Sequence, residues 1–153
     1  MADTSLIENN IGLLIWKASN FWQSKLRKIL IHHKISLNEY LILKSIYFLS
    51  ATNINIYQNE IANFIGIDVS VTSVTLKLLE RKKYIKREFK NDNRRKNIKI
   101  IKEGSNLFNK IHPLLQEEED RLFNKLNNET FNFTNSLKLI LGRKLRIKAE
   151  NKY

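Results

Sequence analysis

The chain has 153 residues, 42% of them hydrophobic, and it contains no cysteine. This is enough for a single domain with a real core. The lack of cysteine excludes disulfides, thiol redox sensing and thiolate metal sites. With 27 Lys and Arg against 15 Asp and Glu, the formal net charge is +12. The expected partner is therefore a polyanion, with nucleic acid favoured over an anionic membrane.

We expect no secretory signal in the first residues, because no basic region leads into an apolar core. The longest apolar runs also fall far short of the roughly 20 residues that a membrane span needs. We expect a soluble, cytoplasmic protein.

The first half of the chain predicts three helices and one short strand. Apolar residues at steps of three to five predict one long amphipathic helix from about Asp3 to His33. Ser36 and Glu39 form a Ser-x-x-Glu capping box, which predicts a helix that ends near Ser50. A short strand is expected at 54–56, and then a helix over 58–65 with Gly66 at its left-handed end.

Asp68 is placed to cap the following helix. On that helix one stripe is predicted to face inward and a second set outward, with Leu76 ambiguous. The inward residues are Ile67, Val71, Val74, Thr75, Leu78 and Leu79, and the outward ones are Ser70, Thr72, Ser73, Lys77 and Glu80.

The remaining chain predicts a hairpin and two further helices. Two β-branched and aromatic runs, 84–89 and 98–101, flank the polar turn 90–93. A helix is expected from Gly104 to about Leu126, with a kink or break at Pro113. Residues 127–130 are expected to cap a last helix that extends past Leu145.

The basic charge is concentrated in the hairpin region. The segment Lys77–Lys102 holds 12 Lys and Arg against three acids, a net charge of +9. The order of helix, turn, helix and basic hairpin is the winged helix-turn-helix layout, in which the second helix enters the major groove and the hairpin reaches the minor groove. The predicted DNA-binding residues are Ser70, Thr72, Ser73, Lys77, Lys86, Arg87, Asp92, Arg94, Arg95 and Lys96.

The ordered motifs resemble those of MarR-family transcription regulators. The matching blocks are Gln58-x-Glu60-Ile61-Ala62, Ile65-Gly66-Ile67-Asp68, Leu79-Glu80-Arg81-Lys82, Ile85-Lys86-Arg87, Asp92-x-Arg94-Arg95 and Gly104. Three positions depart from the family pattern: Lys83 stands where Gly is usual, and Tyr57 and Ile101 stand where Thr is usual. A left-handed residue at Lys83 would cost about 1 kcal/mol.

The resemblance implies a mainly helical protein with a small wing. It places a DNA-binding lobe at about 36–102 and a helical dimerisation lobe at about 3–34 and 104–150. It also implies that Arg94 inserts into the minor groove and that Asp92 positions it, which agrees with the concentrated negative potential of a narrow groove. A repressor acting on a pseudo-palindromic site is favoured over an activator on this resemblance alone.

Apolar residues near both ends of the chain predict a homodimer. The alternative is that these residues complete the core of the monomer. They are Leu6, Ile7, Ile11, Leu14, Leu137, Ile140, Leu141 and Leu145. In the family, small and often aromatic ligands bind between the two lobes. The residues that would line such an effector crevice are Trp16, Trp22, Tyr40, Tyr47 and Phe48, and core packing of the same side chains remains an open alternative.

We expect no enzyme activity, no cofactor and no metal site. His32 and His33 point about 100° apart on a helix, and consecutive acids at 117–120 do not converge. Two other classes remain open. One is a low-specificity nucleoid- or RNA-associated protein, whose binding would be sequence-blind and salt-sensitive. The other is an amphipathic protein at the membrane surface.

Overall fold

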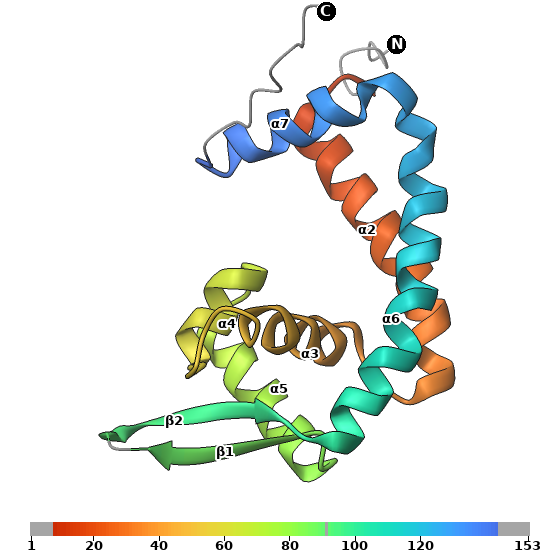
Figure 1. Cartoon of the computed structure of the whole chain (residues 1–153). Helices are drawn as coiled ribbons and strands as arrows, with labels where there is room; N and C mark the ends of the chain where they lie inside the picture. Colours follow the sequence, from red (N-terminus) through yellow and green to blue (C-terminus); the bar gives the residue numbers. More distant parts are fainter. Residues whose placement is uncertain (1–7, 91, 144–153) are drawn as a thin grey trace, which may run out of the picture. The chain divides into compact units, whose positions relative to one another are not determined.

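The computed structural model describes residues 8–90 and 92–143, except for the side chains of residues 90, 92 and 93. The chain is mainly helical and carries one antiparallel two-stranded hairpin, as predicted (Figure 1). The elements are α2 (Ile11–Leu30), η1 (Ile31–His33), α3 (Leu37–Leu49), α4 (Gln58–Ile65), α5 (Val69–Arg81), β1 (Ile85–Lys90), β2 (Asp92–Ile100), α6 (Lys102–Phe123), η2 (Asn124–Glu129) and α7 (Thr130–Ile140). Two compact units, Met1–Gln116 and Glu117–Tyr153, make up the chain.

The first described helix, α2, is shorter than predicted. Asn10 has an extended backbone, and its side-chain oxygen accepts a hydrogen bond from the Leu13 amide at 2.9 Å. A helix that begins on such a cap cannot continue backwards through it, so the prediction of one uninterrupted helix from Asp3 to His33 is wrong at residues 9–10. At its other end the chain leaves η1 through Lys34, which is left-handed with φ 54°.

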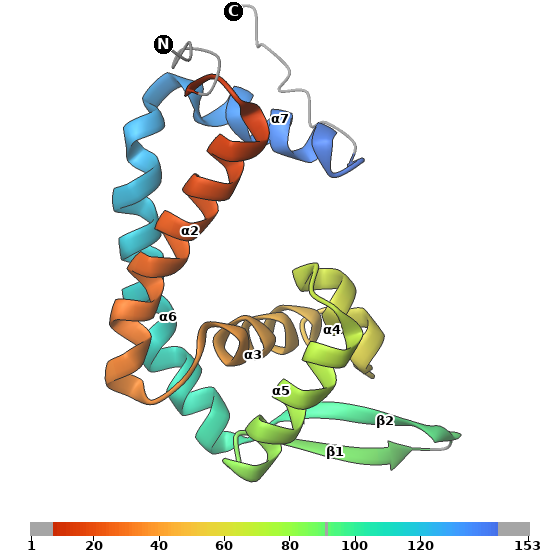
Figure 2. The ribbon, with the colours of Figure 1, turned by 180° about the vertical axis from the view of Figure 1, so that it is seen from behind.

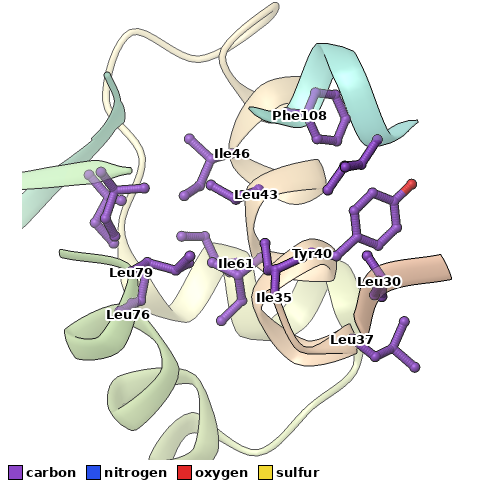
Figure 3. Close-up of a cluster of buried hydrophobic side chains, with 14 of the residues drawn as sticks. Leu30, Ile35, Leu37, Tyr40, Leu43, Ile46, Ile61, Leu76, Leu79 and Phe108 are labelled. Carbon is purple, nitrogen blue, oxygen red and sulfur yellow. The ribbon is translucent and has the colours of Figure 1, made fainter. Parts of the chain in front are cut away.

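Helix α3 lies at the centre of the core of the first unit. It begins on the predicted capping box, because the Glu39 amide donates to Ser36 Oγ at 3.1 Å and the Ser36 amide donates to Glu39 Oε1 at 3.2 Å. Figure 3 shows that its buried face meets side chains from the surrounding helices. Fully buried members of this core include Leu30, Leu43, Ile46, Ile61, Leu76, Leu79 and Phe108.

The segment before α4 is not the short strand that was predicted. The Ile98 amide donates to the Ile56 carbonyl at 2.8 Å, but the Ile56 amide donates to the side-chain oxygen of Asn97, also at 2.8 Å. Because a side chain takes the place of the second backbone partner, no third strand of the sheet forms. Ile56 and Asn97 are both buried.

Helix α6 begins tightly against the base of the hairpin. Gly104 is buried, and a Cβ at this position would overlap the backbone carbonyl of Tyr84. The helix also runs through Pro113 without the break that was considered in the prediction. Ile111 and Leu115, on either side of the proline, are fully buried, and this packing offsets the lost backbone hydrogen bond.

The second unit contains the end of α6, η2 and α7. Asn127 has a positive φ of 44°, which interrupts the helical backbone. The Thr130 hydroxyl donates to the Asn127 carbonyl at 2.8 Å. Helix α7 therefore starts at the predicted place, although no side chain caps its N-terminus.

Among the described residues, no single helix is long and apolar enough to cross a membrane. The bent pair α4 and α5 meets the criteria of length and composition only when the two helices are taken together.

Candidate nucleic-acid interface

A tight turn joins α4 to α5 and sets the angle between them. Gly66 ends α4 in the left-handed region with φ 79°, as predicted, and the chain direction changes by 113° between the two helices. Asp68 caps α5 by accepting from the Ser70 amide at 2.7 Å, and the Gln58 side chain donates to the Val69 carbonyl at 3.3 Å. This is the geometry of a helix-turn-helix, and Figure 2 shows it from behind.

The buried positions of α5 are shifted by about one residue along the sequence from the predicted ones. The buried positions are 72, 75, 76 and 79, so Thr72 is inside whereas Val71, Val74 and Leu78 are exposed. The Thr72 hydroxyl donates to the Asp68 carbonyl at 2.9 Å, and Thr75 bonds to Val71 in the same way at 2.8 Å. Threonine is tolerated inside because the helix itself satisfies its hydroxyl. Thr72 is therefore withdrawn from the predicted DNA-facing set.

The outward face of α5 combines hydroxyl, cationic and apolar side chains. Ser70, Val74, Lys77 and Arg81 lie three or four residues apart and are all exposed. Ser73 is half-buried at the edge of this face.

The first residue of this face, Ser70, already has a hydrogen-bond partner within the helix cap. Its hydroxyl donates to the Asp68 carboxylate at 2.5 Å, and this bond holds the pKa of Asp68 below its ordinary value. The carboxylate also occupies the Ser70 amide. A DNA phosphate would therefore meet a negative charge at this helix end, where free backbone amides would otherwise favour an anion.

The hairpin forms the predicted wing and is irregular near its tip. Its register pairs Ile85 with Ile100 at the base and Phe89 with Lys96 further out, but Lys90 pairs with Asp92. Residues 93–95 of β2 thus have no paired residue on β1, where Phe89 and Lys90 follow each other directly. A bulge of this kind redirects side chains out of the regular alternation. Arg94 and Arg95 lie in this bulge, and both are exposed.

An ion pair joins the wing to helix α5. The Arg87 guanidinium donates to Glu80 Oε2 from two nitrogens, at 2.6 and 3.0 Å. The Arg87 side chain is 13% exposed and that of Glu80 is 39% exposed. The hydrogen bond from Arg87 holds the pKa of the Glu80 carboxyl below its ordinary value. This pairing was not foreseen in the sequence, and it makes Arg87 a structural link between α5 and β1.

The other cations of the wing have partners of different kinds. Lys86 pairs with Glu88 on the same strand at 2.8 Å, with both side chains about half exposed. Arg95 lies over the ring of Tyr57, 5.7 Å from its centroid, and Lys96 lies 5.2 Å from the ring centroid of Phe89. These ring contacts leave guanidinium and ammonium hydrogens available to an anion.

A surface cavity of about 480 Å³ lies between the wing and the start of α4. Its lining residues are Tyr57, Gln58, Asn59, Glu60, Phe89, Arg94, Arg95 and Lys96. Three of them, the consecutive residues Arg94, Arg95 and Lys96, are cations of the predicted DNA-binding set, and they line this cavity together with Tyr57 and Gln58 from the start of α4. The side chain of Asp92, the predicted positioning partner of Arg94, lies outside the described part of the chain.

The residues predicted to line an effector crevice lie on two helices: Tyr40, Tyr47 and Phe48 on α3, and Trp16 and Trp22 on α2. Tyr40 is buried, and its hydroxyl is 2.9 Å from His112 Nδ1. The Tyr47 ring packs against Phe108, with 4.7 Å between centroids, and against Phe48, with 5.6 Å. This cluster includes two residues that the sequence did not indicate, Phe108 and His112.

The two tryptophans of the predicted effector crevice, Trp16 and Trp22, both lie on α2. Trp16 is 66% exposed, whereas Trp22 packs against the core.

The predicted dimerisation residues that can be placed are exposed. On α2 these are Ile11 and Leu14, and at the C-terminal end they are Leu137, Ile140 and Leu141, with exposures from 36% to 71%. Helix α7 has no buried residue at all. Leu6, Ile7 and Leu145 fall outside the described residues.

Comparison with known proteins connects these features to one family. Residues 35–96 match the model described as the MarR family. The chain is 28% identical over 76 residues to YdcH of Bacillus subtilis (strain 168), an uncharacterized HTH-type transcriptional regulator. That match covers 50% of this chain and 52% of the relative, so it spans about half the length of each.

Two solved structures have closely similar folds. The complex of Staphylococcus aureus MepR with DNA has a TM-score of 0.78 at 25% identity, over 88% of this chain and 96% of MepR. CouR from Rhodococcus jostii RHA1, bound to p-coumaroyl-CoA, has a TM-score of 0.77 at 19% identity, over 92% of this chain and 97% of CouR. The latter likeness concerns the fold alone.

Proposed function

Because residues 35–96 match the model of the MarR family, we propose that the chain is a regulator of this family that binds a specific pseudo-palindromic duplex as a homodimer. One observation carries the proposal. An exposed face of α5 and a basic wing lie on the same lobe, and the Glu80–Arg87 ion pair joins the helix to the wing. MepR, a protein of closely similar fold, was solved bound to DNA.

The wing supplies the electrostatic part of the proposed contact. Arg94, Arg95 and Lys96 line one cavity beside Tyr57, and the surrounding segment has a net charge of +9. Cations grouped in this way neutralise several neighbouring phosphates and release their counterions. Arg94, in the bulge of β2, is proposed to enter the minor groove.

The homodimer is proposed because much apolar surface of α2 and α7 has no cover within the described protomer. Ile140 and Leu141 are 64% and 71% exposed, and Ile11 is 70% exposed. Large apolar side chains that are left exposed next to one another, as Ile140 and Leu141 are, mark an interaction surface when they form part of a larger apolar patch. Two-fold symmetry also doubles the number of base contacts, which a single short half-site needs in order to compete with genomic DNA.

Occupation of the site is proposed to repress transcription, and a small aromatic effector is proposed to modulate it. Support for the effector comes from the partly exposed rings of Tyr47 and Phe48, 43% and 44% exposed. Tyr47 packs against the buried ring of Phe108, and Phe48 packs against His112. CouR, which shares the fold, was solved with p-coumaroyl-CoA bound.

Selection of bound duplexes from a random pool tests the proposal. A homodimeric regulator should enrich one sequence with two inverted half-sites about one helical turn, or a multiple of it, apart. A pool that stays random after repeated rounds, while total binding falls steeply with salt, would contradict the proposal and favour the nucleoid- or RNA-associated alternative.

A further inference from the structure

The outward face of α5 carries an apolar stripe where a groove-binding helix usually presents polar side chains. Val74 is 60% exposed, Val71 is 40% exposed and Leu78 is 39% exposed. These residues are three, four and seven apart, so they lie on the same side of the helix. They lie at the middle of the helix face that is proposed to contact DNA.

From this stripe we infer that Val71 and Val74 recognise thymine through its C5 methyl group, which makes the protein selective for half-sites that contain thymine. This inference rests on the proposed function. Valine has neither donor nor acceptor, so it cannot bond to the polar edge of any base. In the major groove, the thymine methyl is the one apolar group that a base pair presents.

Position and stiffness favour Val74 for this role. The N-terminal half of a recognition helix is the part that contacts base edges, and Val74 lies in the second turn of α5, which begins at Val69. A valine in a helix strongly prefers one χ1 rotamer. Its methyl groups are thus already placed before DNA binds, and little side-chain entropy is lost.

The charges around the stripe indicate nucleic acid as the occupant, and not an apolar protein surface. Lys77 and Arg81 are exposed on the same face of α5. The wing adds Arg95 and Lys96 on the lobe. An apolar strip bordered by cations matches a groove whose floor carries methyl groups and whose walls carry phosphates.

The test uses the full-length protein and a duplex selected from a random pool. Each thymine of the half-site is replaced in turn by deoxyuridine, which removes the C5 methyl and keeps every hydrogen-bonding group. At the contacted position the affinity should fall roughly fourfold for one half-site and about fifteenfold when both half-sites are changed. Deoxyuridine outside the half-sites should have no effect.

Two variants assign the effect to the valine. In Val74→Ala the difference between thymine and deoxyuridine at the contacted position should shrink to less than twofold. In Lys77→Ala the affinity for both duplexes should fall together, and their ratio should stay near fourfold. Both residues are exposed, so neither change removes core packing.

The outcomes separate this inference from the proposed function. If the protein prefers its selected site over bulk DNA but every deoxyuridine duplex binds as tightly as the thymine duplex, the inference is overturned and the proposed function stands. A selected half-site without thymine also overturns it. If no sequence is preferred at all, the proposed function fails first.

Discussion

Replacement of Gly104 by alanine should destabilise the protein, although alanine is the better helix former. The residue lies in the first turn of α6, where an added Cβ would overlap the Tyr84 carbonyl oxygen and come within 2.9 Å of the Ile100 side chain. The carbonyl belongs to the backbone and cannot rotate away. It also accepts a hydrogen bond from the Ile101 amide at 3.1 Å, which a displaced helix would lose.

The expected magnitude follows from three effects. Overpacking against a fixed neighbour costs about 1 to 3 kcal/mol, and loss of the Ile101–Tyr84 hydrogen bond costs about 1 kcal/mol. The higher helix propensity of alanine offsets about 1 kcal/mol of this. We therefore expect Gly104→Ala to lower the free energy of unfolding by about 1 to 3 kcal/mol.

Urea unfolding followed by circular dichroism measures this, with Gly12→Ala as the matched control at the same protein concentration. Gly12 also lies in the first turn of a helix, but the nearest atom to its added Cβ is Asn10 Oδ1, at an ordinary contact distance of 3.5 Å. Gly12→Ala should be neutral or stabilising by up to about 1 kcal/mol. If the two variants shift the midpoint in the same direction, the close approach of α6 to Tyr84 is refuted.

Three further changes test other parts of the account. Lys83 has φ 61°, so Lys83→Gly should raise the free energy of unfolding by about 1 kcal/mol in urea; an unchanged midpoint would contradict this. The lowered pKa of Glu80 means that its carboxylate stabilises the folded state. Above pH 4.5 the wild type should therefore be more stable than Glu80→Gln. The difference should not exceed about 1 kcal/mol, because the ion pair is partly exposed. That difference should vanish in urea titrations as the pH falls through the lowered pKa, and a constant difference down to pH 3 would be inconsistent with it. Ile140→Asp should give monomers in sedimentation at low micromolar concentration, whereas Asn132→Asp on the same helix should remain dimeric; equal behaviour of the two would argue against α7 as the interface.

The sequence was sufficient where local chemistry decides the structure. Ser36 with Glu39, Gly66 and Asp68 mark the starts and ends of helices through bonds within a few residues, and each lies where it was predicted. The wing followed from β-branched runs around a polar turn, and its register keeps Ile85 opposite Ile100.

Errors arose where a buried polar side chain makes a hydrogen bond to the backbone. Hydrophobicity placed Val71 and Val74 inside and Thr72 outside, because it takes no account of a threonine hydroxyl that bonds to the carbonyl of Asp68 one turn earlier. Asn97 replaced a strand partner in the same way, through a contact 41 residues away in the chain. The Glu80–Arg87 pair is also invisible to periodicity, since it joins a helix to a strand.

The most direct test of the central claim is the ratio of dissociation constants for a selected duplex and for bulk genomic DNA, measured at physiological salt. A sequence-specific regulator should bind its site at least roughly 10³-fold more tightly than bulk DNA. It should keep a clear preference for that site when added salt weakens both complexes. A ratio near one, with both affinities falling equally as salt rises, would contradict the claim.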